Sequence, residues 1–246
     1  MITMTEETKS YSAKDDATVR AMFAAGAHFG FARGRRHPTV APFMFGVKNR
    51  VEIFDLEKTA GLLEKTLDYV KTLGREGKMI LFVGGKNEAR DAIKNAAVSL
   101  GMPYVAGRWI VGTLTNFKQI RSRVEKFLDL TEKREKGELT KYTKKEQLLI
   151  DREIKNLERF FSGLIPMKEL PKALFVIDSR HEKTAVAEAR KIGIPVAALL
   201  SSDCDLSEVA YPITGNDASI ASIKFFVDRV TWAYQEGRNE RLKAKA

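Results

Sequence analysis

The chain has 246 residues, a formal net charge of +10 and an apolar content of 44%. This length allows one large domain or two small ones, and the apolar content excludes global disorder. The single cysteine, Cys204, excludes a disulfide framework and fits a reducing compartment. The N-terminal segment lacks the apolar core of a signal peptide, and no apolar run approaches the ~20 residues of a membrane span. We therefore expect a cytoplasmic protein that binds no membrane.

The positive charge is concentrated in three stretches. Residues 28–50 contain five cations and no acid, residues 107–161 contain 14 Lys and Arg against 9 Asp and Glu, and residues 237–246 carry a balance of +3. Positive charge that gathers locally is typical of a nucleic-acid-binding protein. It indicates a polyanionic partner without indicating a fold.

The first fifth of the chain has little periodicity. Residues 1–14 are expected to be disordered, and a helix is expected to begin after Asp15 or Asp16, either of which can cap it. Residues 28–50 carry Gly, Pro and Arg without a clear period, so we expect a long basic loop there.

Two later units repeat the same order of elements. Each begins with a continuous apolar run, which is typical of a strand buried on both faces. A polar turn, an Ala-rich helix, a glycine and a second strand follow. The strand, helix and strand fall at 78–85, 86–101 and 103–106 in the first unit and at 172–178, 179–193 and 194–200 in the second. Such β–α–β repeats predict a parallel sheet covered by helices on both faces.

Further elements flank these units. A short strand at 51–54 precedes a helix at 56–74, which Asp55 can cap, and the last helix falls at 216–235. These elements complete an α/β protein.

The segment between the two units has helical periodicity. Its apolar residues recur three and four positions apart at 115–135 and again at 143–163, on either side of a polar turn near Gly137. This spacing predicts two helices packed as an antiparallel coiled-coil hairpin. The domain boundaries that follow are a discontinuous α/β domain at 15–111 and 165–236, an inserted hairpin at 112–164, and disordered tails at 1–14 and 237–246.

One turn of the predicted sheet resembles an anion site. Gly84, Gly85 and Lys86 stand where a strand meets a helix N-terminus. The phosphate-loop pattern G-x-x-x-x-G-K-[ST] is absent, and Asn87 replaces its Ser or Thr. The prediction that a mononucleotide or another phosphate ligand binds here therefore rests on fold analogy alone. The alternative is that these residues form only a tight turn.

Three aspartates follow the ends of predicted strands. Asp178, Asp203 and Asp205, with Cys204 or His181 nearby, have the ligand types to hold a cation, but Asp is equally the ordinary residue of turns and helix caps. No metal-ligand spacing, nucleophile elbow or catalytic triad is recognisable in the chain. We therefore predict no catalytic residue, no metal and no cofactor.

The basic residues are the strongest functional candidates. Arginine forks grip phosphates, and the glycine between Arg33 and Arg35 lets the backbone approach a nucleic acid closely. Trp109 is either an RNA contact or part of the core. The predicted RNA contacts are Arg33, Arg35, Arg36, Lys48, Arg50, Arg108, Trp109, Asn116, Lys118 and Arg121.

Several motifs together resemble those of a known family. In chain order they are "GAHFGFARGRRHPTVAPFMFGVKNRVEIFDLEKT", "GKMILFVGGKNEARDAI", "GMPYVAGRWIVGTLTNF", "LPKALFVIDSRHEKTAVAEARKIGIPVAAL" and "YPITGNDASIASI". The chain resembles the bacterial-type ribosomal protein S2 family of the small subunit over residues 17–236. The combination of the Arg-Trp motif with Gly215-Asn216-Asp217 is specific to it.

The resemblance implies a fold, a function and partners. The fold is α/β, with a parallel β-sheet flanked by helices in a Rossmann- or flavodoxin-like three-layer arrangement and an inserted antiparallel coiled-coil hairpin. The function is that of a non-enzymatic constituent of the small ribosomal subunit. The implied partners are small-subunit ribosomal RNA, neighbouring ribosomal proteins and, where it exists, the large mRNA-binding ribosomal protein, without homo-oligomers. The rivals from other classes are a cytosolic phosphate-ligand-binding protein and a free RNA-binding regulator.

Three positions depart from the family's usual motifs. Phe31 replaces a histidine, and Arg36-His37 replaces Trp-Asn. Val111 replaces a glycine, so this position must adopt an ordinary backbone conformation, because valine is a strong outlier at positive φ.

Overall fold

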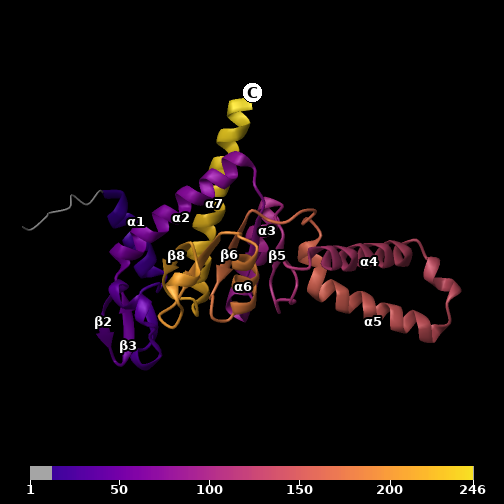
Figure 1. Ribbon diagram of the computed structural model, residues 1–246, viewed down its shortest axis with the longest axis horizontal. Coiled ribbons are helices and arrows are strands. Elements are labelled where there is room, and N and C mark those ends of the chain that lie inside the picture. The colour runs from indigo at the N-terminus through magenta and orange to yellow at the C-terminus, as the bar shows by residue number, and fades with distance from the viewer. Residues whose placement is uncertain (1–12, 246) are drawn as a thin grey trace, which may run out of the picture.

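The centre of the molecule is a parallel β-sheet with the strand order β5-β4-β6-β7-β8 (Figure 1). The structure is a computed structural model and describes residues 13–245. The strands are β4 (Ile80–Val83), β5 (Tyr104–Val105), β6 (Ala173–Ile177), β7 (Val196–Leu200) and β8 (Tyr211–Thr214). Relative to chain order, this is the flavodoxin-like arrangement of a doubly wound sheet. The predicted α/β class is confirmed, and β8 is an additional strand that the sequence pattern does not indicate.

The central strands are buried on both faces. In β4, Leu81 and Val83 pack into one hydrophobic cluster, whereas Ile80 and Phe82 pack into another. Successive side chains of a strand point to opposite faces of the sheet, so two clusters require a layer of helices on each face. This double burial is the reason for the continuous apolar runs in the sequence.

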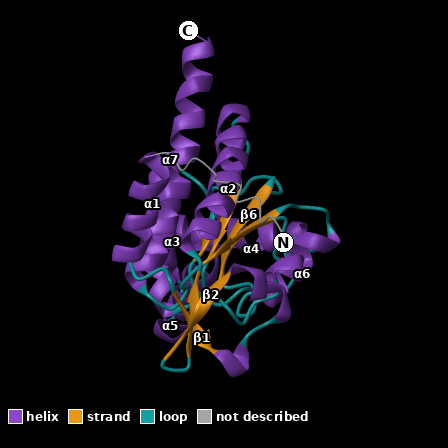
Figure 2. Ribbon diagram, turned by 90° about the vertical axis from the view of Figure 1, so that its left-hand side faces the viewer, coloured by secondary structure: helices purple, strands orange, loops and turns teal. Residues whose placement is uncertain are grey.

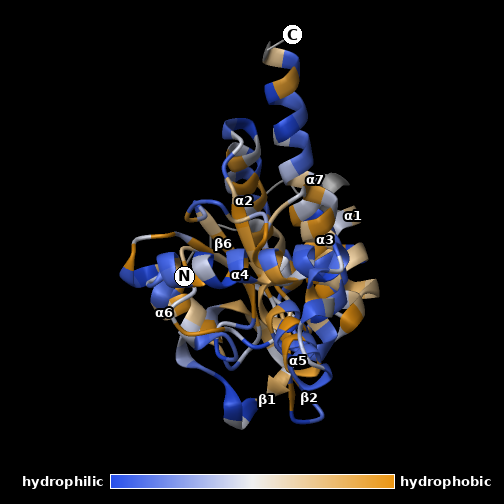
Figure 3. Cartoon of the chain, turned by 90° about the vertical axis from the view of Figure 1, so that its right-hand side faces the viewer, coloured by the Kyte–Doolittle hydropathy of each residue, from blue (hydrophilic) through white to orange (hydrophobic). Residues whose placement is uncertain are grey.

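Helices cover the two faces unequally (Figure 2). One face carries α2 (Leu56–Glu76), α3 (Asn87–Leu100) and α7 (Ile220–Lys245), and the other carries α6 (Lys183–Lys191). The Asp55 side chain accepts hydrogen bonds from the N–H groups of Glu57 and Lys58, so the predicted cap of α2 is confirmed. Hydrophobic residues follow the strands in the middle of the molecule, and hydrophilic residues dominate the last turns of α7 (Figure 3).

The two ends of the chain differ from expectation. α7 continues to Lys245, so the prediction of a disordered tail at 237–246 is wrong for residues 237–245. The tail is helical because α7 packs along α2, where Lys71 forms an ion pair with Glu240. At the other end, α1 (Ala13–Ala24) packs against α2, and the disorder predicted for 1–14 otherwise concerns residues outside the described part of the chain.

Residues 28–50, which we expect to form a loop, contain two strands. β1 (Phe29–Ala32), β2 (Met44–Lys48) and β3 (Val51–Phe54) form an antiparallel sheet in the order β1-β3-β2, and the 3-10 helices η1 (Arg33–Arg35) and η2 (Pro38–Phe43) lie between β1 and β2. Asn49 and Arg50, with φ of 52° and 66°, form the two-residue turn of a β-hairpin. The pattern escapes sequence analysis because no residue of β1 or β2 is fully buried, so burial imposes no regular apolar alternation on these strands.

The segment between β5 and β6 forms a helical hairpin that projects from the sheet domain (Figure 1). It consists of α4 (Phe117–Glu135), η3 (Glu138–Lys141), α5 (Lys144–Phe161) and η4 (Ser162–Leu164). Gly137 turns the chain at φ 73°, and Thr143 and Glu146 form a capping box that starts α5. The supercoiling of the two helices and the boundaries at 112–164 remain predictions.

Candidate nucleic-acid interface

Three predicted RNA-binding residues meet at the tip of the small sheet. The Arg33 N–H donates to the Arg50 carbonyl at 3.2 Å, which joins η1 to the β2–β3 turn, and Lys48 is the last residue of β2. We call Arg33, Lys48 and Arg50 the tip cations. All three are exposed, and none forms an ion pair with another residue that the structure describes. They form a patch of unpaired positive charge.

The neighbouring arginines hold the basic segment in place. Arg35 donates to Asp203 at 2.9 Å, and Arg36 lies 3.2 Å from Glu52, whose side chain is fully buried. The Arg35 guanidinium also lies 4.3 Å from the centre of the Phe31 ring, so the phenylalanine that replaces a histidine contributes a cation–π contact. These arginines anchor the segment that presents the tip cations.

A second group of predicted contacts lies at the base of the hairpin. Arg108 and Lys118 are exposed and form no ion pair among the described residues; we call them the base cations. Asn116 is exposed at the N-terminus of α4, and its side chain makes no capping hydrogen bond. Arg121 is engaged with Glu125 at 3.1 Å and with the Ile165 carbonyl at 3.5 Å. This group therefore has two free cations and one free amide.

The two groups flank the turn that follows β4. The small sheet lies toward one end of the long axis, whereas the base of the hairpin adjoins the central sheet and only the hairpin's tip reaches the other end (Figure 1). Lys86 lies 5.9 Å from the centre of the Phe31 ring, and a Cβ at Gly85 would lie 2.8 Å from the carbonyl oxygen of Gly107, the neighbour of Arg108. Residues of this turn therefore stand between the two groups.

Trp109 is the one predicted contact that the structure removes from the surface. Its side chain is only 7% exposed, and its indole N–H donates to Glu188 at 3.1 Å. A stacked base needs an exposed ring face, so the prediction that Trp109 contacts RNA is wrong. Its role is to pack the start of the segment that carries the base cations.

Glu188 organises this segment, and sequence analysis misses it. Its carboxylate accepts hydrogen bonds from the backbone N–H groups of Gly112 at 2.7 Å, Leu114 at 3.0 Å and Thr115 at 3.2 Å. Burial raises the pKa of Glu188, but these N–H groups and the Trp109 indole outweigh burial and lower it. The available signal is its place in the sequence, since helical spacing puts Glu188 on the buried face of an Ala-rich helix.

The backbone around Glu188 agrees with the expectation for Val111. Gly112 takes φ 92°, whereas Val111 is absent from the residues with positive φ and is 77% exposed. Gly112 takes the positive φ that the turn requires, so Val111 before it keeps an unstrained backbone conformation.

The crevice where a doubly wound sheet binds its ligand lies between β4 and β6, because the strand order reverses there. Lys86, after β4, donates to Asp178 at 2.7 Å and to Asp217 at 2.9 Å. The Gly85 N–H donates to Glu182 at 3.0 Å. A phosphate at this turn would replace or face three carboxylates, so the site is filled by the protein's own charges.

Electrostatics fix the protonation of this cluster. Burial raises the pKa of Asp178, but the hydrogen bond and charge of Lys86 outweigh it and lower that pKa. Burial lowers the pKa of Lys86, and the two aspartates outweigh it and raise that pKa. Lys86 is therefore charged and holds together two buried acids that follow two different strands, β6 and β8.

The aspartates that we considered as cation ligands do not meet at one point. Asp178, Cys204 and Asp217 place their ligand atoms within 4.8 Å of one another, but Lys86 already supplies the positive charge there. Asp203 pairs with Arg35 and Arg180, both at 2.9 Å. Asp205 caps η5 (Leu206–Glu208) by accepting from the Ser207 N–H.

These features define the class of the protein. It is an α/β scaffold whose ligand crevice is closed by its own side chains and whose unpaired cations lie on the small sheet and at the base of the hairpin. The chain matches the sequence model of the family "Ribosomal protein S2" over residues 22–237. It belongs to the ribosomal protein S2 family, which is structural and not enzymatic.

Individual relatives agree with this assignment. The chain is 41% identical to small ribosomal subunit protein uS2 of Coprothermobacter proteolyticus, over 91% of this chain and 84% of the relative. It is 42% identical to the protein of the same name from Sulfurimonas denitrificans, over 90% of this chain and 85% of the relative. It is 40% identical to the protein of the same name from Helicobacter hepaticus, over 91% of this chain and 84% of the relative. None of the helices that the structure describes carries an apolar run long enough to cross a bilayer.

Proposed function

We propose that the chain is a structural constituent of the small ribosomal subunit in the cytoplasm, where it binds small-subunit ribosomal RNA and neighbouring ribosomal proteins. Family membership over most of the chain carries this proposal. The unpaired cations of the small sheet and of the hairpin base support it, because exposed Lys and Arg without counter-acids neutralise phosphates.

Burial and pairing support a narrower assignment of the RNA contacts. The tip cations and the base cations are the direct phosphate contacts, and Asn116 adds a hydrogen-bonding group beside the base cations. Arg35, Arg36 and Arg121 are already paired with acids, so we assign them a positioning role with at most a secondary contact. Trp109 leaves the set because it is buried.

We propose RNA contacts at both groups, the small sheet and the base of the hairpin. Recruitment of the large mRNA-binding ribosomal protein remains a proposal that rests on the family resemblance.

The rival function, binding of a phosphorylated small molecule at Gly84–Lys86, is not favoured. Its anion site is occupied by Asp178, Asp217 and Glu182. A ligand at 100 times its dissociation constant stabilises a protein by about 2.7 kcal/mol, so a thermal-shift screen with nucleotides tests this function directly. We expect no shift from any nucleotide.

The decisive experiment is incorporation of charge-reversed chains into small subunits. Cells express a tagged copy with Arg33→Glu and Arg50→Glu, or with Arg108→Glu and Lys118→Glu. Sucrose gradients then measure the fraction of tagged chain in the subunit at increasing salt. Each pair should weaken incorporation, and loss of two phosphate contacts should reduce the salt slope of RNA affinity by about 2.

A matched control reverses two exposed cations away from both groups. Arg90→Glu and Lys94→Glu on α3 change the charge equally, and neither residue forms an ion pair among the described residues. This control should enter subunits normally. A natural chain that stays at the top of the gradient would refute the ribosomal role and favour the free RNA-binding regulator.

A further inference from the structure

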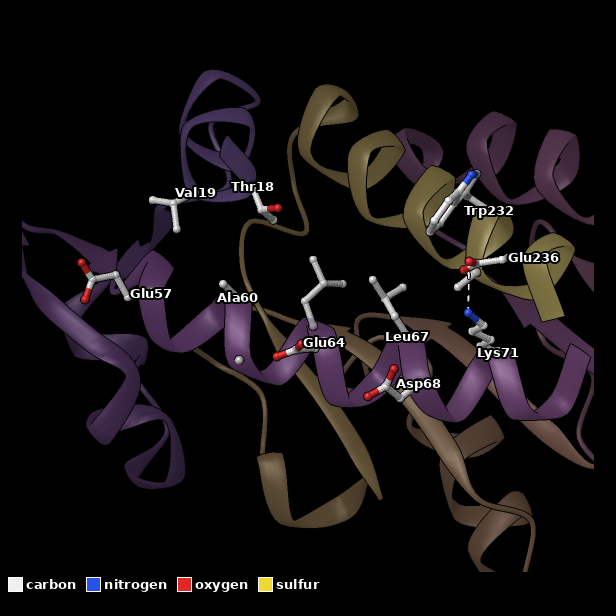
Figure 4. A pocket seen from close by; sticks show the side chains of 13 residues that line it. Thr18, Val19, Glu57, Ala60, Glu64, Leu67, Asp68, Lys71, Trp232 and Glu236 are labelled. Atoms are coloured by element: carbon white, nitrogen blue, oxygen red, sulfur yellow. Dashed lines mark ion pairs between the residues drawn. The ribbon is translucent and has the colours of Figure 1, made fainter. Parts of the chain in front are cut away.

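One groove of the described chain has none of the tip or base cations in its lining. It runs between α1, α2 and α7 and has a volume of about 510 Å³ (Figure 4). α2 supplies most of its wall, through residues that recur three and four positions apart from Glu57 to Lys71. Trp232 and Glu236 face it from α7, and Thr18 and Val19 close it from α1.

The floor of this groove is apolar. Leu63 is buried at its base, and Val19, Ala60 and Leu67 are partly buried around it. The indole of Trp232, which is 57% exposed, stands at the edge of the groove (Figure 4). A large aromatic ring left exposed beside a hollow with an apolar floor is typical of a binding surface rather than of a solvated face.

The rim of the groove is acidic. Glu57, Glu64 and Asp68 are exposed along α2, and Glu236 lies opposite them on α7. Lys71 is the one cation among the described lining residues, and it is already paired with Glu236 at 3.0 Å and with Glu240 at 2.9 Å. Glu64 and Asp68 form no ion pair with another described residue.

Acids gathered on a chain of net charge +10 exclude RNA from this surface. They favour an occupant with the opposite charge, and the apolar floor requires that this occupant also carry hydrophobic side chains. An amphipathic helix with apolar residues on one face and Lys or Arg beside them meets both conditions, because a third helix can lay its apolar face between two others.

We propose that the groove between α1, α2 and α7 binds a cationic amphipathic helix of a neighbouring protein in the same particle. Its apolar residues lie against Leu63, Leu67 and Trp232. Its Lys and Arg residues pair with Glu64 and Asp68. The surface is thus a protein-facing side of a molecule whose two cation groups face RNA. Only the source of the helix, a neighbouring protein of the ribosomal particle, rests on the proposed function.

The first test uses the isolated chain and a synthetic helical peptide of Leu and Lys in amphipathic spacing. Binding is followed by the fluorescence of Trp232, with Trp232→Phe as the blank, because Trp109 is buried elsewhere. We expect a blue shift on binding. We expect no saturable binding of a scrambled peptide of equal composition, of a Leu–Glu peptide, or of single-stranded polyuridine.

Charge reversal locates the binding. Glu64→Lys with Asp68→Lys should weaken the affinity for the amphipathic peptide at least tenfold. Glu135→Lys with Glu138→Lys makes the same change in charge on two exposed acids of the distant hairpin, and it should leave the affinity unchanged. Equal loss in both variants, or equal binding of the scrambled peptide, would overturn the proposal, since either result means unspecific charge attraction.

The second test uses assembled small subunits. A photo-crosslinking amino acid at position 68 should join a protein segment of net positive charge, identified by mass spectrometry, and Glu64→Lys should abolish the crosslink. Crosslinks to RNA or to a second copy of this chain, or none at all, would overturn the proposal. If the chain does not enter subunits, the ribosomal role fails instead, and the peptide titration still decides whether the groove binds such a helix.

Discussion

Glu188 on α6 accepts a hydrogen bond from the indole of Trp109 at 3.1 Å, across 79 residues of sequence. The same carboxylate accepts three backbone N–H groups of the segment that follows the tryptophan. A single buried acid therefore sets the shape of the segment from Arg108 to Lys118. The base cations reach the surface because a negative charge beneath them fixes the backbone that carries them.

The first prediction concerns this acid. Glu188→Gln should lower the free energy of unfolding by about 3 kcal/mol, because hydrogen bonds to a charged acceptor each contribute about 1.5–3 kcal/mol and an amide NH₂ would face N–H donors. The midpoint of urea unfolding measures the loss. Glu158→Gln, on the exposed side of α5, is the control and should change stability by no more than about 0.5 kcal/mol. Equal midpoints for the two variants would contradict the role of Glu188.

The second prediction is a pH dependence of stability. The pKa of Glu188 is lowered in the folded chain from its ordinary value of 4.5. The unfolded chain therefore binds the proton more readily, and the stabilisation is present above pH 4.5 and lost as the pH falls through the folded pKa. The difference in unfolding free energy between the natural chain and Glu188→Gln should shrink below pH 4.5. A constant difference across this range would contradict the assignment.

The sequence predicts the sheet well because its signal is local. Each buried strand is a short apolar run, and each following helix has its own spacing and its own cap, as Asp55 shows for α2. The positions of the basic segments can also be predicted, since charged residues are counted directly from the sequence. What a single run of sequence does not show is which of these charges are neutralised by partners far along the chain.

The differences between expectation and structure follow from that limit. Arg35 and Arg36 look like free cations, yet their partners Asp203 and Glu52 come from other elements. Trp109 looks like a surface aromatic because Glu188 lies 79 residues away. The helical tail of α7 depends on packing against α2, which no local pattern reports. Long-range pairing, rather than propensity, decides each case.

The third prediction concerns the closed crevice. Lys86→Met should lower the free energy of unfolding by about 3–5 kcal/mol, because it leaves Asp178 and Asp217 buried without their shared cation. Adding Asp217→Asn should recover part of the loss, since one of the two charges disappears. Thermal and urea unfolding measure both variants. If the double variant is less stable than Lys86→Met, the ion pairs are not the source of the loss.

The fourth prediction concerns Cys204. The thiol is buried and close to Asp178, and burial, together with that negative charge, raises its pKa to about 12. The thiolate is the reactive form, so the folded chain should resist iodoacetamide near neutral pH. Alkylation should become rapid in denaturant. Mass spectrometry after timed exposure measures both rates, and fast alkylation of the folded chain would contradict this burial.

The last prediction separates two glycines that helix propensity treats alike. A Cβ at Gly237 of α7 would overlap the backbone carbonyl oxygen of Lys71 on α2, whereas a Cβ at Gly61 meets nothing within 4 Å. Alanine is the better helix former by about 1 kcal/mol, so Gly61→Ala should raise the free energy of unfolding by that amount. Gly237→Ala should lower it by about 2 kcal/mol, because backbone cannot move aside as a side chain can.

The two variants test the packing that makes the tail of α7 helical. If Gly237→Ala also stabilises the chain, the backbones of α2 and α7 are not in the close contact at Gly237 that the structure shows. Circular dichroism then gives an independent readout, because a weakened contact should reduce the helical signal of the last turns of α7. Gly61→Ala should leave that signal unchanged or raise it, since Gly61 lies on α2 away from the contact with α7. A loss of helix in Gly237→Ala alone therefore ties the order of residues 237–245 to the close approach of two backbones rather than to their own propensity.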